Sequence, residues 1–146
     1  CSFCLCPETL LHVVAGCQSY LQRFTWRHDS ILNFIAETLQ TTCAGQFYAD
    51  LPGFRTPSII CRDAYRPDLL LITPDAKLYS VELTVGFETN LHNNVERKKA
   101  KYEELIKEMK NNFVSVKFVS LSISCLNTGS GSNKKLQLRQ DGCSIQ

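Results

Sequence analysis

The feature that most constrains this chain is a crowd of potential metal ligands in its first 17 residues, with the spacing Cys1-x2-Cys4-x7-His12-x4-Cys17. A structural zinc ion takes four such thiolate and imidazole ligands in a closed tetrahedron. A head of 1–25 is too short to bury a core of its own, so a metal ion would replace one. Cys6 could replace Cys1 as the fourth ligand, although the Cys4-x-Cys6 spacing leaves only one residue between two ligands. The spacing therefore predicts a structural Zn²⁺ site and favours Cys1 over Cys6.

The eight cysteines of this 146-residue chain allow another interpretation, a small secreted domain held by disulfide bonds. The crowding around His12 and the lack of a secretory signal pattern favour a metal site in a reducing compartment. Because the chain begins with Cys1, we expect a piece of a longer protein. No run of 18 apolar residues occurs, so we expect no membrane span. The net charge of +2 is too small to indicate a nucleic-acid partner by itself.

The pattern beyond the head predicts an α/β fold. The expected elements are a helix over roughly 30–41, a possible strand at 46–49, strands at 69–72 and 78–85 forming a hairpin, a helix at 91–112 and a strand at 114–124. Asp29 or Ser30 is placed to cap the first helix. We expect three parts: the head, a core at 26–126, and a tail at 127–146 without a clear element.

Two strands carry informative alternation. In the second hairpin strand, Val81 and Leu83 share one face, and the other face is polar, with Ser80, Glu82 and Thr84. In the last strand the apolar positions change phase after residue 118, which indicates either a bulge or burial on both faces.

The hairpin brings two carboxylates together. Asp68 precedes its first strand and Glu82 lies in the middle of the second, fourteen residues later. Paired carboxylates repel unless a cation lies between them, and Mg²⁺ is held by one or two carboxylates plus phosphate oxygens. Many surface hairpins also carry two acids, so this pair alone is a weak signal.

The long helix strengthens the signal. Lys98 falls inside its apolar stripe, which comprises Val95, Tyr102, Leu105, Ile106 and Met109. Lys101 lies on the flank of the stripe and Lys99 points elsewhere. A lysine within a buried stripe needs a partner, or else extends its aliphatic stem to solvent.

Five motifs in this order resemble one family. They are the Cys/His head, Arg27-His28-Asp29, Arg66-Pro67-Asp68, Glu82, and Lys98-x2-Lys101-Tyr102. The order and spacing resemble the restriction-like endonuclease domain of early-branching, often site-specific, non-LTR retrotransposon polyproteins. That family belongs to the PD-(D/E)XK nucleases, whose core order is α-β-β-β-α-β. The usual lysine two residues after the second acid is here Thr84, and the resemblance implies a lysine from the following helix instead.

The resemblance implies a metal-dependent DNA endonuclease that nicks target DNA, so that a reverse transcriptase of the same polyprotein can prime on the exposed 3′ end. Asp68 and Glu82 would hold Mg²⁺ or Mn²⁺, and Lys98 or Lys101 would stabilise the phosphate or the attacking water. The zinc head, a CCHC knuckle, and the segment containing Arg23, Arg27 and His28 would contact DNA phosphates. The implied partners are target DNA, retrotransposon RNA and the reverse transcriptase domain, and the implied place of action is the nucleus.

Two other functions stay open from the sequence. One is a catalytically decayed nuclease core that binds DNA without cutting it, and a metal-dependent nicking assay separates it from the enzyme. The other is a zinc-stapled protein-interaction domain, which would lack the steep salt dependence of phosphate contacts.

Overall fold

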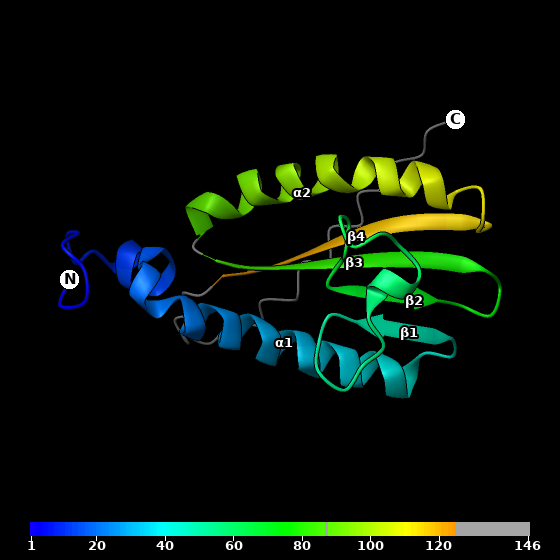
Figure 1. Ribbon diagram of the computed structural model, residues 1–146, viewed down its shortest axis with the longest axis horizontal. Helices are drawn as coiled ribbons and strands as arrows, with labels where there is room; N and C mark the ends of the chain where they lie inside the picture. The colour runs from blue at the N-terminus through cyan, green and yellow to red at the C-terminus, as the bar shows by residue number, and fades with distance from the viewer. Residues whose placement is uncertain (87, 125–146) are drawn as a thin grey trace, which may run out of the picture.

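We analysed a computed structural model of the chain, which describes residues 1–86 and 88–124, with the side chains of 88–95 left out. Two long helices enclose a four-stranded sheet (Figure 1). The elements in chain order are η1 (His12–Gly16), η2 (Gln18–Tyr20), α1 (Leu21–Thr42), β1 (Gln46–Ala49), η3 (Pro57–Ile59), β2 (Leu69–Ile72), β3 (Lys77–Gly86), α2 (Glu88–Met109) and β4 (Ser115–Ser124). The expected mixed α/β fold is confirmed, and the tail predicted at 127–146 lies outside the described residues.

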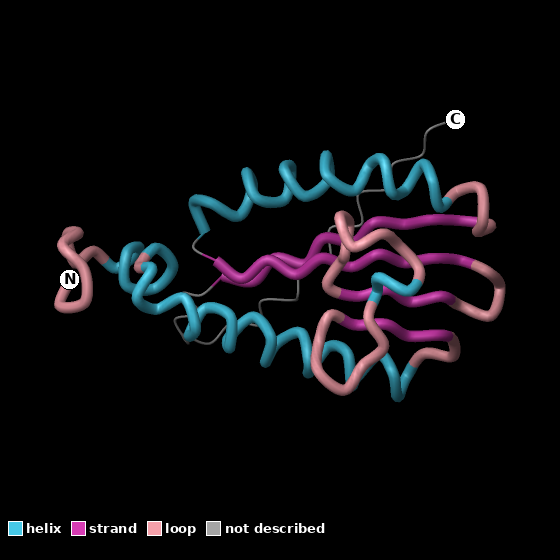
Figure 2. Tube along the Cα trace, in the orientation of Figure 1, coloured by secondary structure: helices cyan, strands magenta, loops and turns pink. Residues whose placement is uncertain are grey.

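The sheet has the order β1-β2-β3-β4. Strand β2 runs antiparallel to both β1 and β3, which confirms the hairpin, whereas β3 and β4 are parallel. Parallel neighbours need a long crossover, and α2 supplies it. Figure 2 shows the four strands side by side between the two helices. The possible strand at 46–49 is present as β1.

The two helices cover opposite faces of the sheet (Figure 1). Leu32 and Ala36 of α1 pack in a core that contains Val81 and Leu83 of β3. A second core, on the α2 side, groups the buried residues Tyr48, Cys61, Leu70, Leu78, Tyr102 and Leu105. Successive side chains of a strand point to opposite faces, so the alternation of β3 divides it between the two cores.

Helix α1 begins nine residues before the predicted start, at Leu21. Asp29 and Ser30 therefore lie within the helix, and the prediction that one of them caps it was wrong. The segment gave a weak helical signal because its inward-facing positions include polar side chains. Arg27 donates to the carbonyl oxygen of Val14 at 3.1 Å, a contact that the sequence does not reveal.

The face of β3 predicted to be polar is buried. Ser80, Glu82 and Thr84 are 1%, 3% and 8% exposed, because α2 lies over them. The phase change in β4 reflects burial on both faces rather than a bulge. Val119 packs with the α1-side core and Phe118 with the other, while β4 stays in continuous register with β3.

Within the described residues, neither helix has the apolar length needed to cross a membrane.

Candidate functional site

The four predicted ligands of the head converge. The ligand atoms of Cys1, Cys4, His12 and Cys17 all lie within 4.8 Å of one another. Cys17 Sγ is 3.9 Å from Cys1 Sγ and 3.8 Å from Cys4 Sγ, and Cys4 Sγ is 3.0 Å from His12 Nε2. Zinc–sulfur bonds of about 2.3 Å place two thiolates of a tetrahedron roughly 3.8 Å apart. The cluster could hold a metal ion, and its dimensions are compatible with structural zinc.

The set that forms contains Cys1 and not Cys6. The Cys6 side chain is exposed, and its backbone carbonyl accepts a hydrogen bond from the N-terminal ammonium group. A hydrogen bond from the backbone of Cys6 lowers the pKa of the Cys4 thiol, which favours the thiolate that binds metals. Cys1, Cys4, Cys6, Cys17, Cys43 and Cys61 are all free thiols.

The two predicted acids also lie together, on adjacent strands. Asp68 immediately precedes β2, and the register Leu69↔Val81 sets it beside Glu82 of β3. The backbone N–H of Leu83 donates to Asp68 Oδ2 at 2.7 Å, and the N–H of Asp68 donates to Glu82 Oε1 at 3.3 Å. The two strands thus fix both carboxylates through reciprocal backbone contacts.

Lys98 supplies the positive charge between the acids. Its Nζ lies 2.7 Å from Glu82 Oε2 and 3.9 Å from Asp68 Oδ2, and it donates to the carbonyl oxygen of Leu83 at 2.7 Å. The side chain is 24% exposed, so it turns inward instead of extending to solvent. An ammonium group from α2, and not a side chain at the strand position of Thr84, therefore contacts the two carboxylates.

Lys101 takes a different direction. Its Nζ is 3.4 Å from the hydroxyl of Tyr102 and lies over that ring at 4.9 Å. In the part of the chain that the structure describes, no ion pair joins Lys101 to either acid. Of the two candidate lysines, only Lys98 contacts the carboxylates.

His28 belongs to this site, although its sequence position suggested a DNA-contacting segment. Its Nε2 lies 3.5 Å from Asp68 Oδ2 and its Nδ1 lies 3.0 Å from Asp29 Oδ1. The hydrogen bond to Asp68 is the largest influence, and it outweighs burial and raises the pKa of His28 to about 9. The missed signal was periodicity, since His28 precedes the buried Leu32 and Ala36 by four and eight residues.

The surroundings push the two carboxylates in opposite directions. Burial would raise the pKa of Asp68, but His28, the N–H of Leu83 and Lys98 outweigh it and hold that pKa below its usual value. Burial and the neighbouring charge of Asp68 raise the pKa of Glu82 despite its contact with Lys98. Separated pKa values in a paired set of acids are typical of catalytic sites.

The loop before Asp68 is anchored on both sides. The Tyr102 hydroxyl donates to the carbonyl oxygen of Arg66 at 3.3 Å, and burial raises the pKa of Tyr102 far above its ordinary value. The N–H of Asp50 donates to the carbonyl oxygen of Asp68 at 2.9 Å, and Arg66 forms an ion pair with the Asp50 carboxylate. These contacts fix the backbone that carries Asp68.

The head and the segment with Arg23, Arg27 and His28, which the resemblance implies as DNA contacts, offer few free positive charges for phosphate groups. Residues 1–22 contain no Lys or Arg. Arg27 is engaged with the Val14 carbonyl and His28 with Asp68. Arg23 lies over the Tyr20 ring at 4.8 Å.

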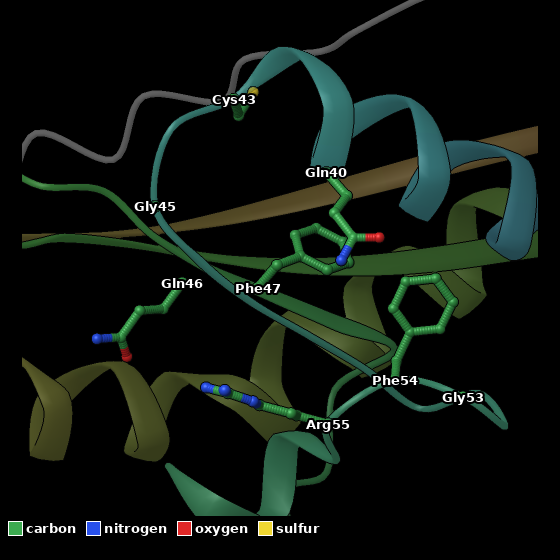
Figure 3. Close-up of a pocket in the computed structure, with 8 residues that line it drawn as sticks. All are labelled: Gln40, Cys43, Gly45, Gln46, Phe47, Gly53, Phe54 and Arg55. Atoms are coloured by element: carbon green, nitrogen blue, oxygen red, sulfur yellow. The ribbon is translucent and has the colours of Figure 1, made fainter.

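A pocket of about 370 Å³ lies elsewhere, between the end of α1, β1 and the following loop. Figure 3 shows the rings of Phe47 and Phe54 at this pocket, with Gln40 and Arg55 nearby. None of the predicted site residues lines it.

Comparisons with protein families, curated proteins and solved structures found no match for this chain.

The head cluster predicts tight binding of one metal ion. We expect the purified protein to carry about one equivalent and His12→Ala to lose it, because three ligands no longer close the tetrahedron. Metal analysis after gel filtration measures this. Cys6→Ser is the matched control and should keep its metal, and a metal-free wild type prepared under reducing conditions would refute the prediction.

The His28 contacts predict a pH-dependent contribution to stability. The folded pKa of about 9 lies above the ordinary 6.5, so the contribution is complete below pH 6.5 and is lost as the pH rises through 9. We expect wild type to exceed His28→Gln in unfolding free energy by on the order of 2 kcal/mol at pH 6, discounted for partial exposure, and by little at pH 10. Urea unfolding at both pH values measures this difference. An NMR titration should show that Asp68→Asn lowers the pKa of His28, and an unchanged pKa would contradict the assigned contact.

Proposed function

We propose that this chain is a metal-dependent DNA endonuclease domain that nicks target DNA for target-primed reverse transcription. The observation that carries the proposal is a pair of carboxylates from adjacent strands, Asp68 and Glu82, with the ammonium group of Lys98 between them. The element order α1, β1, β2, β3, α2, β4 supports it, because the resemblance implies that order. The proposed partners are target DNA, retrotransposon RNA and the polyprotein's reverse transcriptase, with action in the nucleus.

The acid pair suits one divalent cation. Lys98 Nζ already lies within 4 Å of both carboxylates, so these groups form a place for positive charge. Two carboxylates leave most positions of a Mg²⁺ ion to water and phosphate oxygens, as is usual for this metal. We propose that Asp68 and Glu82 hold Mg²⁺ or Mn²⁺, which would polarise the phosphodiester and lower the pKa of a bound water.

The residues of the chain then have distinct tasks. The oxygen of a water molecule forms a bond to phosphorus, the bond from phosphorus to O3′ breaks, and the proton balance leaves a 3′-hydroxyl and a 5′-phosphate. Lys98 stabilises the negative charge that builds on the phosphate, since a fixed cation in a shielded site does this better than solvent. His28 keeps Asp68 ionised and oriented from the opposite helix.

We assign the head a structural role. Zn²⁺ bound by Cys1, Cys4, His12 and Cys17 would close the segment before α1, and Arg27 ties that segment to the helix through Val14. The lack of Lys and Arg in 1–22 argues against the head as the main phosphate-binding surface.

The acids predict a loss of cleavage without a loss of binding. Asp68→Ala and Glu82→Ala should each abolish Mg²⁺-dependent nicking, while DNA affinity stays within a few-fold or rises because negative charge is removed. A supercoiled-plasmid nicking assay and a DNA-binding titration measure the two effects. Asp75→Ala, in the exposed turn between β2 and β3, is the control and should cut normally. Wild-type cleavage by either acid variant would remove that residue from the site.

The contacts of Lys98 and Lys101 predict that losing Lys98 slows cleavage more than losing Lys101. Lys98→Ala should slow cleavage by roughly 10²–10³, the usual cost of one preorganised donor, and Lys98→Arg should recover only part. Lys101→Ala should cost less, because its Nζ contacts Tyr102 and not the acids. Single-turnover rates measure these effects, with Lys107→Ala as the control because Lys107 pairs with the exposed Glu103. An inactive Lys101→Ala beside an active Lys98→Ala would reverse the assignment.

A further inference from the structure

Two buried hydroxyl groups beside Glu82 have no hydrogen-bond partner among the described residues. Thr84 Oγ1 and Ser120 Oγ are both shielded from solvent and unpaired, and the Thr84 residue is only 8% exposed. Thr84 follows Glu82 by two residues on the same face of β3, and Ser120 is the β4 residue directly opposite Glu82. The three side chains therefore form a polar corner beneath α2.

The surroundings of Ser80, which precedes Glu82 by two residues on the same face of β3, are less polar than this corner. Ser80 Oγ is also buried and unpaired within the described part of the chain, but its cross-strand neighbours are Leu70 and Phe118. Phe118 is stacked on the Tyr102 ring, with 5.4 Å between ring centroids, so Ser80 lies in apolar surroundings. Thr84 lies beyond the end of β2, and its cross-strand neighbour in β4 is Ser122, which also carries a hydroxyl.

A buried hydroxyl without a hydrogen-bond partner is destabilising, so two of them beside one carboxylate call for a shared partner. An internal water needs two to four polar partners. On this face the Cα atoms of Glu82 and Ser120 lie roughly 5 Å apart and those of Glu82 and Thr84 roughly 6–7 Å apart, so a water beside the Glu82 carboxylate has a hydroxyl-bearing residue on each of two sides. Glu82 offers lone pairs beyond those used by Lys98 and the Asp68 N–H.

We propose that Thr84 and Ser120 hold an ordered water molecule against Glu82, and that this water is the one that attacks the phosphodiester. The role of this water as the nucleophile rests on the proposed function. The water's oxygen would form the new bond to phosphorus, its first proton would pass to Glu82 and then to solvent, and the departing O3′ would take a proton from solvent. Thr84 and Ser120 act through the water and are positioning residues.

The first test measures the water site without added Mg²⁺ and without DNA. Thr84→Val keeps the shape of the side chain but removes the hydroxyl, so a hydrated corner predicts a lower urea midpoint, with Thr84→Ser close to wild type. Valine also favours strands more than threonine does, and this preference alone would raise the urea midpoint of Thr84→Val. Ser80→Ala is the control and should be unchanged or more stable. An unchanged or raised midpoint in Thr84→Val would show a dry corner and overturn the proposal.

The second test measures single-turnover nicking. Thr84→Val should cut roughly 10–100-fold more slowly with unchanged DNA affinity, because the nucleophile is displaced, and Thr84→Ser should restore the rate. Full activity of Thr84→Val would overturn the nucleophile assignment. Asp68→Asn separates the two ideas: if it cuts like wild type, the proposed nuclease function fails, while the urea midpoint still decides whether the water is held.

Discussion

Glu82 places a carboxylate where only 3% of the residue is exposed, and the neighbouring structure compensates for that burial. A buried charge is costly unless it is paired and hydrogen-bonded. The compensation comes from Lys98 and from the backbone N–H of Asp68. Helix α2 both covers Glu82 and carries Lys98. The helix that removes the Glu82 carboxylate from water therefore also supplies the positive charge that pairs with it. The packing of α2 on the sheet through Tyr102 and Leu105 is therefore a condition for the site to exist.

Asp68 depends on the opposite helix as well. It receives His28 from α1, the Leu83 N–H from β3 and Lys98 from α2, so three separate elements converge on one carboxylate. Glu82 takes its positive partner from α2 instead. This asymmetry explains why the pKa of Asp68 is lowered while that of Glu82 is raised, although the two groups are neighbours. The arrangement thus keeps Asp68 ionised, which the proposed role of this carboxylate as a metal ligand would require.

The features that could be predicted from the sequence are those that local pattern determines. The hairpin fixes Asp68 beside Glu82 through strand register, and helical phase alone turns Lys98 inward. The convergence of Cys1, Cys4, His12 and Cys17 was likewise predicted, because the spacing of a short Cys/His cluster is visible in the sequence. The order of the main elements was predicted for the same reason, since each has its own apolar period.

The features that were missed depend on long-range packing. The early start of α1 and the role of His28 require knowledge that Asp68 lies across the sheet as a partner. The burial of Thr84 likewise depends on α2 and not on the strand that contains it. Alternation shows that two faces differ, but it cannot show that a polar face is covered.

The head and the acid pair are connected through α1. The cluster ends at Cys17, the helix begins at Leu21, and His28 lies two turns into it. Arg27, the residue before His28, bonds back to Val14 within the head. A metal ion bound in the head would therefore restrain the turns of α1 that present His28 to Asp68. Under the proposed function, the site would depend on the head through the orientation of one helix, with no contact between the head and DNA.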